Sequence, residues 1–132
     1  MVEMNKISGI LKEEKKVSFA YLFGSFARGD NRDDSDIDVG VFVKNFKGIV
    51  PDYELELGLK IEREIGAPVE IVILNDKPLT IITEVLKHGK IIFSRDEKER
   101  VKFETFMLSQ IQDFNRVVVE FDNMRLKKYG IR

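Results

Sequence analysis

The chain has 132 residues, of which 43% are hydrophobic and 34% are charged, and its formal net charge is −1. This length is enough for one domain with a real core, and the balanced charge gives no electrostatic case for direct nucleic-acid binding. The absence of cysteine excludes a disulfide framework and a thiolate metal site. No stretch approaches the length of a membrane span and the first residues do not resemble a signal peptide, so we expect a cytoplasmic protein without a membrane contact.

The first third of the chain predicts a helix followed by a buried strand. Ile7, Ile10 and Leu11 share one face of a helix predicted at about 3–15. The run VSFAYLF at 17–23 is rich in aromatic and branched residues, which is typical of a buried strand. Gly24-Ser25 then predicts a turn that ends this strand, followed by a short helical turn. Glycine in such a turn lets the backbone approach a phosphate closely.

Two aspartates mark the start of the next predicted strand, which runs to residue 43. Side chains alternate along a strand, so Asp36 and Asp38 point the same way, roughly 6.5–7 Å apart. Two carboxylates placed together beside an apolar strand repel each other and resist burial. Mg²⁺ relieves both problems, because it takes oxygen ligands from one or two carboxylates and from substrate phosphates.

An aspartate-rich segment can also be a solvated turn, a calcium-binding loop or part of another nucleotide site, and the sequence distinguishes among these. The stretch from Asp30 to Asp34 is typical of a solvated turn, and some glycosyltransferases use a bare Asp-x-Asp. An EF-hand loop starting at Asp34 would need glycine at its sixth position and glutamate at its twelfth, but these are Val39 and Asn45. A Walker-type loop needs Gly-Lys-Ser/Thr, which is absent. The informative feature is therefore the whole series of strand, Gly-Ser, ten residues, Asp-x-Asp and strand.

The middle of the chain alternates helices and strands. A helix predicted at 52–64, with Asp52 as its cap and Gly66 as its stop, precedes a strand predicted at 69–74. A short helix at 79–86 and a short strand at 91–93, expected at the sheet edge, follow. The single charge in the strand at 69–74 is Glu70, which is either merely exposed at the strand's start or lies beside Asp36 and Asp38 and completes an acidic cluster.

The last part of the chain predicts one long helix from Asp96 to Lys128. Apolar residues at 103, 107, 111, 114, 118 and 121 follow the helical period, and others widen the stripe beyond one face. A surface helix on so small a domain does not need this much apolar area. Either both ends of the helix wrap the domain's own core, or the distal half, about 111–126, docks on a partner or on a second copy. We expect one domain at 1–132, with a core at about 1–94 and a helical extension at about 96–128.

Gly24-Ser25, ten residues and Asp36-x-Asp38 resemble the signature of the DNA polymerase β-like nucleotidyltransferase superfamily. The string GSFARG followed by SDIDV resembles its minimal nucleotidyltransferase (MNT) branch, and 89–114 resembles the C-terminal portion of MNT antitoxins. The resemblance implies an α/β (α+β) fold like the polymerase β palm, with a mixed sheet of about four strands flanked by helices and a long C-terminal helix.

The same resemblance implies roles for the acidic residues. Asp36 and Asp38 correspond to residues that hold Mg²⁺, with two ions expected from the in-line transfer of a nucleotidyl group. Glu70 occupies a position at which the family usually has aspartate, in a pattern like Val-Asp-Leu-Val. It is expected to hold the second ion or to orient the attacking hydroxyl, and the longer side chain puts that role in question.

The residues after the first strand are expected to bind the nucleotide. Gly24 and Ser25 correspond to residues that hold the β- and γ-phosphates of ATP. Arg28 is expected to pair with a phosphate or with the acceptor, and a solvated arginine on the helix surface is the alternative.

The resemblance also implies a partner and a reaction. MNT proteins are commonly encoded beside a HEPN protein, a ribonuclease-type toxin, and the MNT member is the antitoxin that transfers AMP from ATP to a tyrosine of the toxin. Two alternatives stay open. The first is a non-catalytic antitoxin that neutralises its partner by binding. The second is a small-molecule nucleotidyltransferase of the aminoglycoside-modifying kind, against which the lack of an acceptor domain argues.

Overall fold

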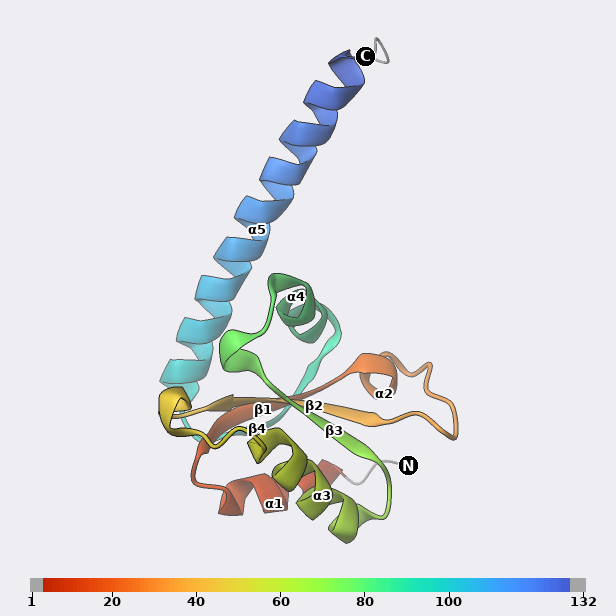
Figure 1. Ribbon diagram of the computed structural model, residues 1–132, viewed down its shortest axis with the longest axis vertical. Coiled ribbons are helices and arrows are strands. Elements are labelled where there is room, and N and C mark those ends of the chain that lie inside the picture. Colours follow the sequence, from red (N-terminus) through yellow and green to blue (C-terminus); the bar gives the residue numbers. More distant parts are fainter. Residues whose placement is uncertain (1–3, 129–132) are drawn as a thin grey trace.

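The computed structural model describes residues 4–128, with their side chains through Met124. Its strands form one sheet in the order β3-β2-β1-β4, as Figure 1 shows. The central strand β1 pairs antiparallel with β2 and β4, whereas β2 and β3 are parallel. The strands are β1 (Val17–Phe23), β2 (Ile37–Val43), β3 (Val69–Ile73) and β4 (Lys90–Ser94). The predicted mixed sheet of four strands is confirmed, and the last strand lies at an edge as expected.

Helices cover both faces of the sheet. They are α1 (Met4–Glu13), α2 (Gly24–Arg28), α3 (Tyr53–Ile65), α4 (Leu79–His88) and α5 (Glu97–Lys128). On one face α1 and α3 pack through residues such as Leu11 and Ile61 against the sheet. On the other face α4 and the first turns of α5 pack through Ile82, Val85 and Phe103. Among residues 4–128, no helix has the length and apolar character that a membrane span requires.

The face under α4 and α5 is aromatic. The rings of Phe19 and Phe42 stack with centroids 4.7 Å apart, and the Phe103 ring lies 5.5 Å and 5.1 Å from them. Aromatic contacts at these spacings add to the free energy gained from burying the rings. Phe103 therefore fixes the start of α5 on the sheet.

Most predicted boundaries hold within two residues, and the helix ends explain the differences. The predicted helix stop at Gly66 is confirmed, because this residue ends α3 in the left-handed conformation with φ +71°. The expected cap at Asp96 is present, because the backbone N–H of Glu99 donates to Asp96 Oδ1 at 3.1 Å. The prediction that Asp52 caps α3 is wrong, because the Asp52 side chain makes no capping hydrogen bond.

The strand predicted at 69–74 ends one residue earlier, at Ile73. Its last predicted residue, Leu74, opens a short 3₁₀ turn instead. The next residue, Asn75, accepts a hydrogen bond from the backbone N–H of Val43 and donates one to the Val43 carbonyl, both at 2.9 Å. A side-chain amide thus continues the ladder of β2 where β3 has stopped, and local sequence patterns do not reveal such a contact.

The long helix α5 packs on the domain only through its first turns. Figure 1 shows the rest of α5 extending beyond α4 and away from the sheet. From Gln112 to Met124 the side chains are exposed, apart from the half-buried Asn123. The expectation that both ends of this helix wrap the domain's own core is therefore wrong for the described part of α5. Leu126, which the sequence places in the docking half, lies outside the described side chains.

Candidate functional site

Asp38 and Glu70 lie opposite each other on the parallel strands β2 and β3. Because side chains alternate along a strand, Asp38 shares a sheet face with Phe42, and Glu70 shares it with Val72. Phe42 and Val72 pack against the core under α4 and α5, so both carboxylates lie on that side of the sheet. The expected proximity of Glu70 to Asp38 is confirmed. Asp36 lies just before β2, where it is exposed.

Gly24 brings the turn after β1 against Asp38. Its φ is +73°, a conformation that favours glycine. A Cβ atom on Gly24 would lie only 2.1 Å from Asp38 Oδ2, closer than any real contact. The sequence predicts that this glycine allows the close approach of a phosphate. The structure shows a second reason, because the glycine also makes room for a carboxylate from the neighbouring strand.

Burial raises the pKa of Asp38 to about 6, and the negative charges of Glu70 and Asp36 add to the increase, whereas Arg28 opposes it. A carboxylate that is disfavoured by burial and by two like charges suits a divalent cation, which would relieve both penalties. In residues 4–128, no three acidic or histidine side chains are gathered as a ready metal site. The carboxylates of Asp38 and Glu70, which lie opposite each other, are oxygen donors of the kind that Mg²⁺ takes together with nucleotide phosphates and water.

Ser25 follows Gly24 as the second residue of α2 and is half-buried. Its carbonyl accepts hydrogen bonds from the backbone N–H groups of Gly29 at 2.9 Å and Asp30 at 3.1 Å. These bonds close α2 within five residues, with Gly29 at φ +82°. The structure thus places Ser25 beside the Gly24–Asp38 contact, where the sequence motif predicts the nucleotide phosphates.

Arg28 ends α2 and is held by two carboxylates. Its Nε lies 3.2 Å from Asp30 Oδ2 and its Nη1 lies 2.5 Å from Glu84 Oε1 on α4. The pair with Glu84 ties α2 to α4, whereas Asp30 lies in the loop directly after α2. The neighbouring carboxylates give Arg28 a structural partner on each side, so a bound phosphate would compete with them.

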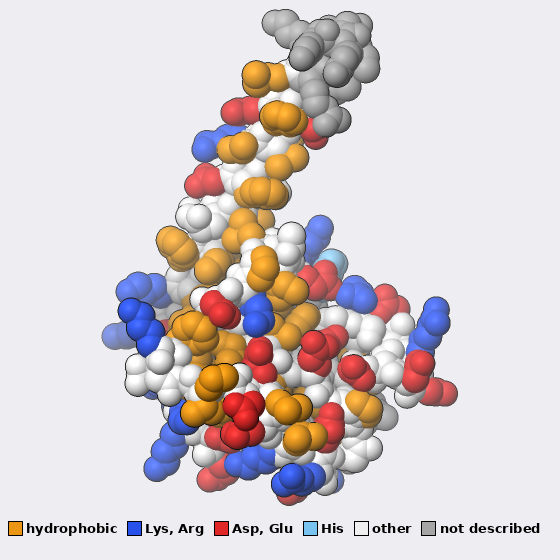
Figure 2. Space-filling view, viewed as in Figure 1, with side chains coloured by type: hydrophobic (Ala, Val, Ile, Leu, Met, Phe, Trp, Pro, Cys, Tyr) orange, Lys and Arg blue, Asp and Glu red, His pale blue; other side chains and the backbone are white. Residues whose placement is uncertain are grey.

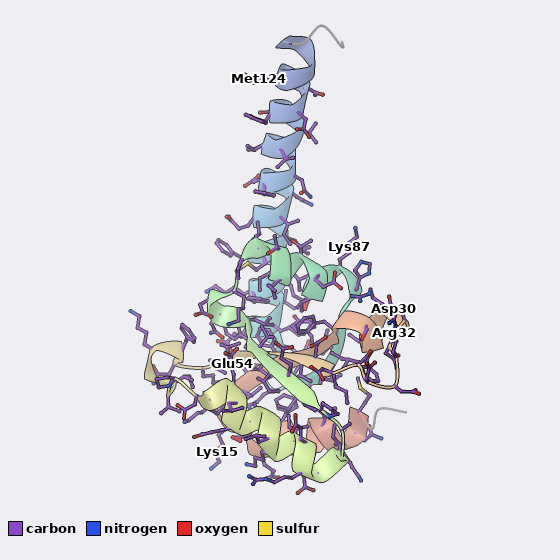
Figure 3. The ribbon with its side chains drawn as sticks, turned by 45° about the vertical axis from the view of Figure 1, so that its right-hand side comes forward. Lys15, Asp30, Arg32, Glu54, Lys87 and Met124 are labelled. Carbon is purple, nitrogen blue, oxygen red and sulfur yellow. The ribbon has the colours of Figure 1, made fainter. Side chains whose placement is uncertain are left out.

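A groove of about 340 Å³ runs beside these residues, between α3 and the edge of β3. Asp36 and Glu70 line one end of it, and the sequence gives no sign of it. Two of its lining residues bind the backbone of β3: Glu62 Oε1 accepts the backbone N–H of Val69 at 2.9 Å, and Glu54 Oε2 accepts that of Ile73 at 2.8 Å. Figure 3 shows Glu54 on α3 beside β3. In the sequence these two glutamates are typical of the solvated face of a helix. In the structure their side chains accept backbone N–H groups at the edge of the sheet.

Residues 5–98 match the sequence profile of the family described as polymerase beta, nucleotidyltransferase. The chain belongs to this nucleotidyltransferase family. The matched residues contain all four strands, the Gly24 turn and the three carboxylates.

Two relatives of this nucleotidyltransferase are named for one activity. It is 26% identical over 98 residues to the protein adenylyltransferase MntA of Shewanella oneidensis, which covers 74% of this chain and 69% of that protein. It is 39% identical over 70 residues to a candidate protein adenylyltransferase of Methanocaldococcus jannaschii, which covers 52% of this chain and 69% of the relative.

Two solved structures share the fold of this chain over most of its length. A chain in a crystal structure of a toxin–antitoxin with AMP-PNP aligns with a TM-score of 0.76 and 25% identity, over 93% of this chain and 99% of that one. A chain of a tri-AMPylated Shewanella oneidensis HEPN toxin in complex with an MNT antitoxin aligns with a TM-score of 0.68 and 23% identity, over 92% and 95% of the two chains. At that coverage the shared fold includes much of α5, so the expected fold with a long C-terminal helix is confirmed.

Proposed function

We propose that this nucleotidyltransferase is the antitoxin of a toxin–antitoxin pair and transfers AMP from ATP to a tyrosine hydroxyl of a HEPN-type partner. The observation that carries the proposal is the contact of Gly24 with Asp38 beside Glu70, which joins the expected phosphate turn to the paired carboxylates. The activity named for the two relatives, and the AMP-PNP and AMPylated toxin in the related structures, support the same reaction.

In the reaction, the acceptor oxygen attacks the α-phosphorus of ATP and the bond from that phosphorus to the β-phosphate oxygen breaks, which releases pyrophosphate. The hydroxyl proton leaves as the new P–O bond forms. Asp36 and Asp38 would hold Mg²⁺, and Glu70 would bind a second ion or accept the hydroxyl proton. Mg²⁺ supplies neutralisation of the charge on the phosphates. The start of α2 at Gly24 and Ser25 binds the β- and γ-phosphates, and this turn adjoins Asp38.

Several observations favour a role for Glu70 in the transfer reaction. It is exposed, whereas Asp38 beside it is half-buried, so an incoming hydroxyl reaches Glu70 without displacing the core. Its charge raises the pKa of Asp38 and hence acts on the same site. A glutamate in place of the family's usual aspartate keeps the carboxylate and adds one methylene of reach.

The proposal is tested by intact mass spectrometry of the HEPN-type protein encoded beside this chain, after co-expression. The wild-type chain should add one or more adenylyl groups to tyrosine. The Asp36→Asn/Asp38→Asn variant should add none while still expressing as a folded protein. An unmodified partner with the wild-type chain, in a complex that still forms, would reject the transferase reaction for this pair.

A second candidate function, neutralisation by binding alone, is favoured by α5. Its exposed apolar surface lies outside the catalytic motif, so binding does not require the carboxylates. The test is growth of cells that express the partner together with the Asp36→Asn/Asp38→Asn variant. Growth equal to that with the wild-type chain supports occlusion, whereas arrested growth supports the transferase.

A further inference from the structure

The exposed apolar side chains of α5 fall into two groups on opposite sides of the helix. At about 100° per residue, Phe121 lies five full turns beyond Phe103 and therefore points the same way. The larger group lies within about 60° of this direction, and we call it the α5 stripe. It consists of Phe106, Phe114, Val117, Val118, Phe121 and Met124. The smaller group, about 140–160° away, consists of Val101, Leu108 and Val119.

The direction of the α5 stripe is set by the sheet. Phe103 packs onto Phe19 and Phe42, on the sheet face that also carries Asp38 and Glu70. Since the α5 stripe continues the face of Phe103, it points to the space over α4 on the same side of the domain as the carboxylates. Figure 2 shows apolar side chains continuing from the domain along α5.

The first turns of α5 are held firmly, so this direction is not arbitrary. The hydroxyl of Ser18 on β1 donates to Glu99. The hydroxyl of Tyr21 donates to Glu104 Oε2 at 2.6 Å, and Arg100 donates to the same oxygen at 2.7 Å. Two residues of β1 thus anchor the first turns of α5 in addition to the Phe103 contacts, and the rest of the helix extends beyond them.

We infer that the acceptor protein docks on the α5 stripe and rests on α4, so that docking surface and transfer site share one side of the domain. The inference rests on the proposed function for the occupant's identity. The stripe exposes on the order of 600 Å² of apolar surface, somewhat less than the ~800 Å² that each partner of a standard interface buries. Contact with α4 supplies the difference and brings the acceptor toward Asp38 and Glu70.

A second copy of this chain is a poorer occupant. Pairing two α5 helices side by side needs the coiled-coil spacing over at least three or four heptads. In α5 the alternating spacing of four and three runs through apolar residues only from Met107 to Phe121. The next two positions of that spacing are Arg125 and Lys128, which do not suit a coiled-coil core.

The experiment compares Val117→Lys with Val119→Lys, two residues apart on α5. The wild-type valines are 58% and 57% exposed, and only Val117 belongs to the α5 stripe. Affinity of the full chain for the HEPN-type protein encoded beside it is measured by titration calorimetry. We expect Val117→Lys to weaken binding at least tenfold, because it buries a charge in an apolar interface. Val119→Lys should bind within threefold of the wild-type chain.

Lysine acetylation with mass spectrometry then tests the side on which the partner sits. Lys87 lies on α4, and Lys15 lies beside α1 on the opposite face of the sheet (Figure 3). Both are exposed in the chain alone. Binding of the partner should protect Lys87 severalfold and leave Lys15 unchanged.

The outcomes separate this inference from the proposed function. Equal loss of binding in both valine variants, or protection of Lys15 instead of Lys87, would overturn it. A chain that sediments as a dimer, becomes monomeric with Val117→Lys and still binds the partner would assign the α5 stripe to a second copy. Binding and protection as expected without any adenylylation would sustain the docking geometry and reject the transferase reaction.

Discussion

Asp38 and Glu70 are neighbours across the parallel β2–β3 pair, and Gly24 approaches Asp38 so closely that no Cβ fits between them. Three separate segments of the chain therefore meet at one half-buried carboxylate. This arrangement makes the site sensitive to small changes at each of the three positions, which allows each to be tested alone.

Gly24→Ala should damage both stability and activity. The new methyl group meets Asp38 Oδ2 and the residue keeps a positive φ, so we expect a loss of about 1–3 kcal/mol in the free energy of unfolding. Adenylylation of the partner should fall in parallel. The matched control is Gly9→Ala in α1, where a Cβ meets nothing within 4 Å and the higher helix propensity of alanine should stabilise by up to about 1 kcal/mol. Urea unfolding measures both changes, and equal stability of the two variants would contradict the close approach at Gly24.

Asp38→Asn should stabilise the metal-free protein at neutral pH. The folded-state pKa of Asp38 is about 6 against an ordinary 3.8, so folding disfavours the charged form. The wild-type protein therefore loses stability as pH rises from about 4 to 6, and the variant does not. Since Asp38 is partly exposed, we expect an advantage of only about 1 kcal/mol above pH 6 and none below pH 4.

Thermal unfolding in EDTA checks this prediction, with an expected rise in Tm of ~3–5 °C for Asp38→Asn at pH 7.5. Added Mg²⁺ and ATP should raise the Tm of the wild-type protein and leave that of the variant nearly unchanged, because ligands that bind the folded state stabilise it. A lower Tm for the metal-free variant would mean that the charge of Asp38 is stabilising, contrary to its surroundings.

Glu70→Asp and Glu70→Gln should separate the charge of this residue from its length. The aspartate variant keeps the charge and shortens the side chain by one methylene, so adenylylation should stay within about tenfold of the wild-type rate. The glutamine variant keeps the shape and removes the charge, so we expect a loss of about 10²–10⁴-fold. Both are measured as initial rates of partner modification at saturating ATP. Full activity of Glu70→Gln would remove Glu70 from the reaction.

Glu54→Ala/Glu62→Ala should free the edge of β3. Each glutamate accepts a backbone N–H of that strand, and the loss of both bonds should cost about 1–3 kcal/mol in total. The exposed edge should also promote self-association, because unpaired N–H groups are a template for another strand. Light scattering on heating and urea unfolding measure these effects. Glu64→Ala, on an exposed position of the same helix, is the control and should behave as the wild-type protein.

Much of this structure is predictable from local patterns, because its elements are strongly periodic. The strand at 17–23 is predicted to the residue, since an unbroken apolar run ends at a Gly-Ser turn. The proximity of Glu70 to Asp38 is one of two alternatives that the sequence leaves open, and the pairing of β2 with β3 decides for it. The direction of α5 is not predictable from local patterns, because it depends on contacts between residues far apart in the chain, such as Ser18 with Glu99 and Tyr21 with Glu104.

In the candidate site, too, local sequence patterns predict some features, whereas contacts between distant residues are not predictable from them. The sheet face that carries Asp38 follows from strand alternation along β2, but the reason for Gly24 requires its distance to Asp38 on a different element. The ion pair of Arg28 with Glu84 likewise joins residues that no sequence spacing relates. Spacing rules describe neighbours on one element, and these contacts join different elements.

The exposed α5 stripe also makes the lifetime of the chain in the cell depend on whether a partner is bound. An uncovered row of large apolar side chains on an extended helix is what chaperones and proteases bind in the cell. A partner that covers the stripe removes that surface, so molecules in the complex should outlast molecules that are alone. The amount of this protein in the cell should then follow the amount of its partner, with the excess continually degraded and replaced by new synthesis.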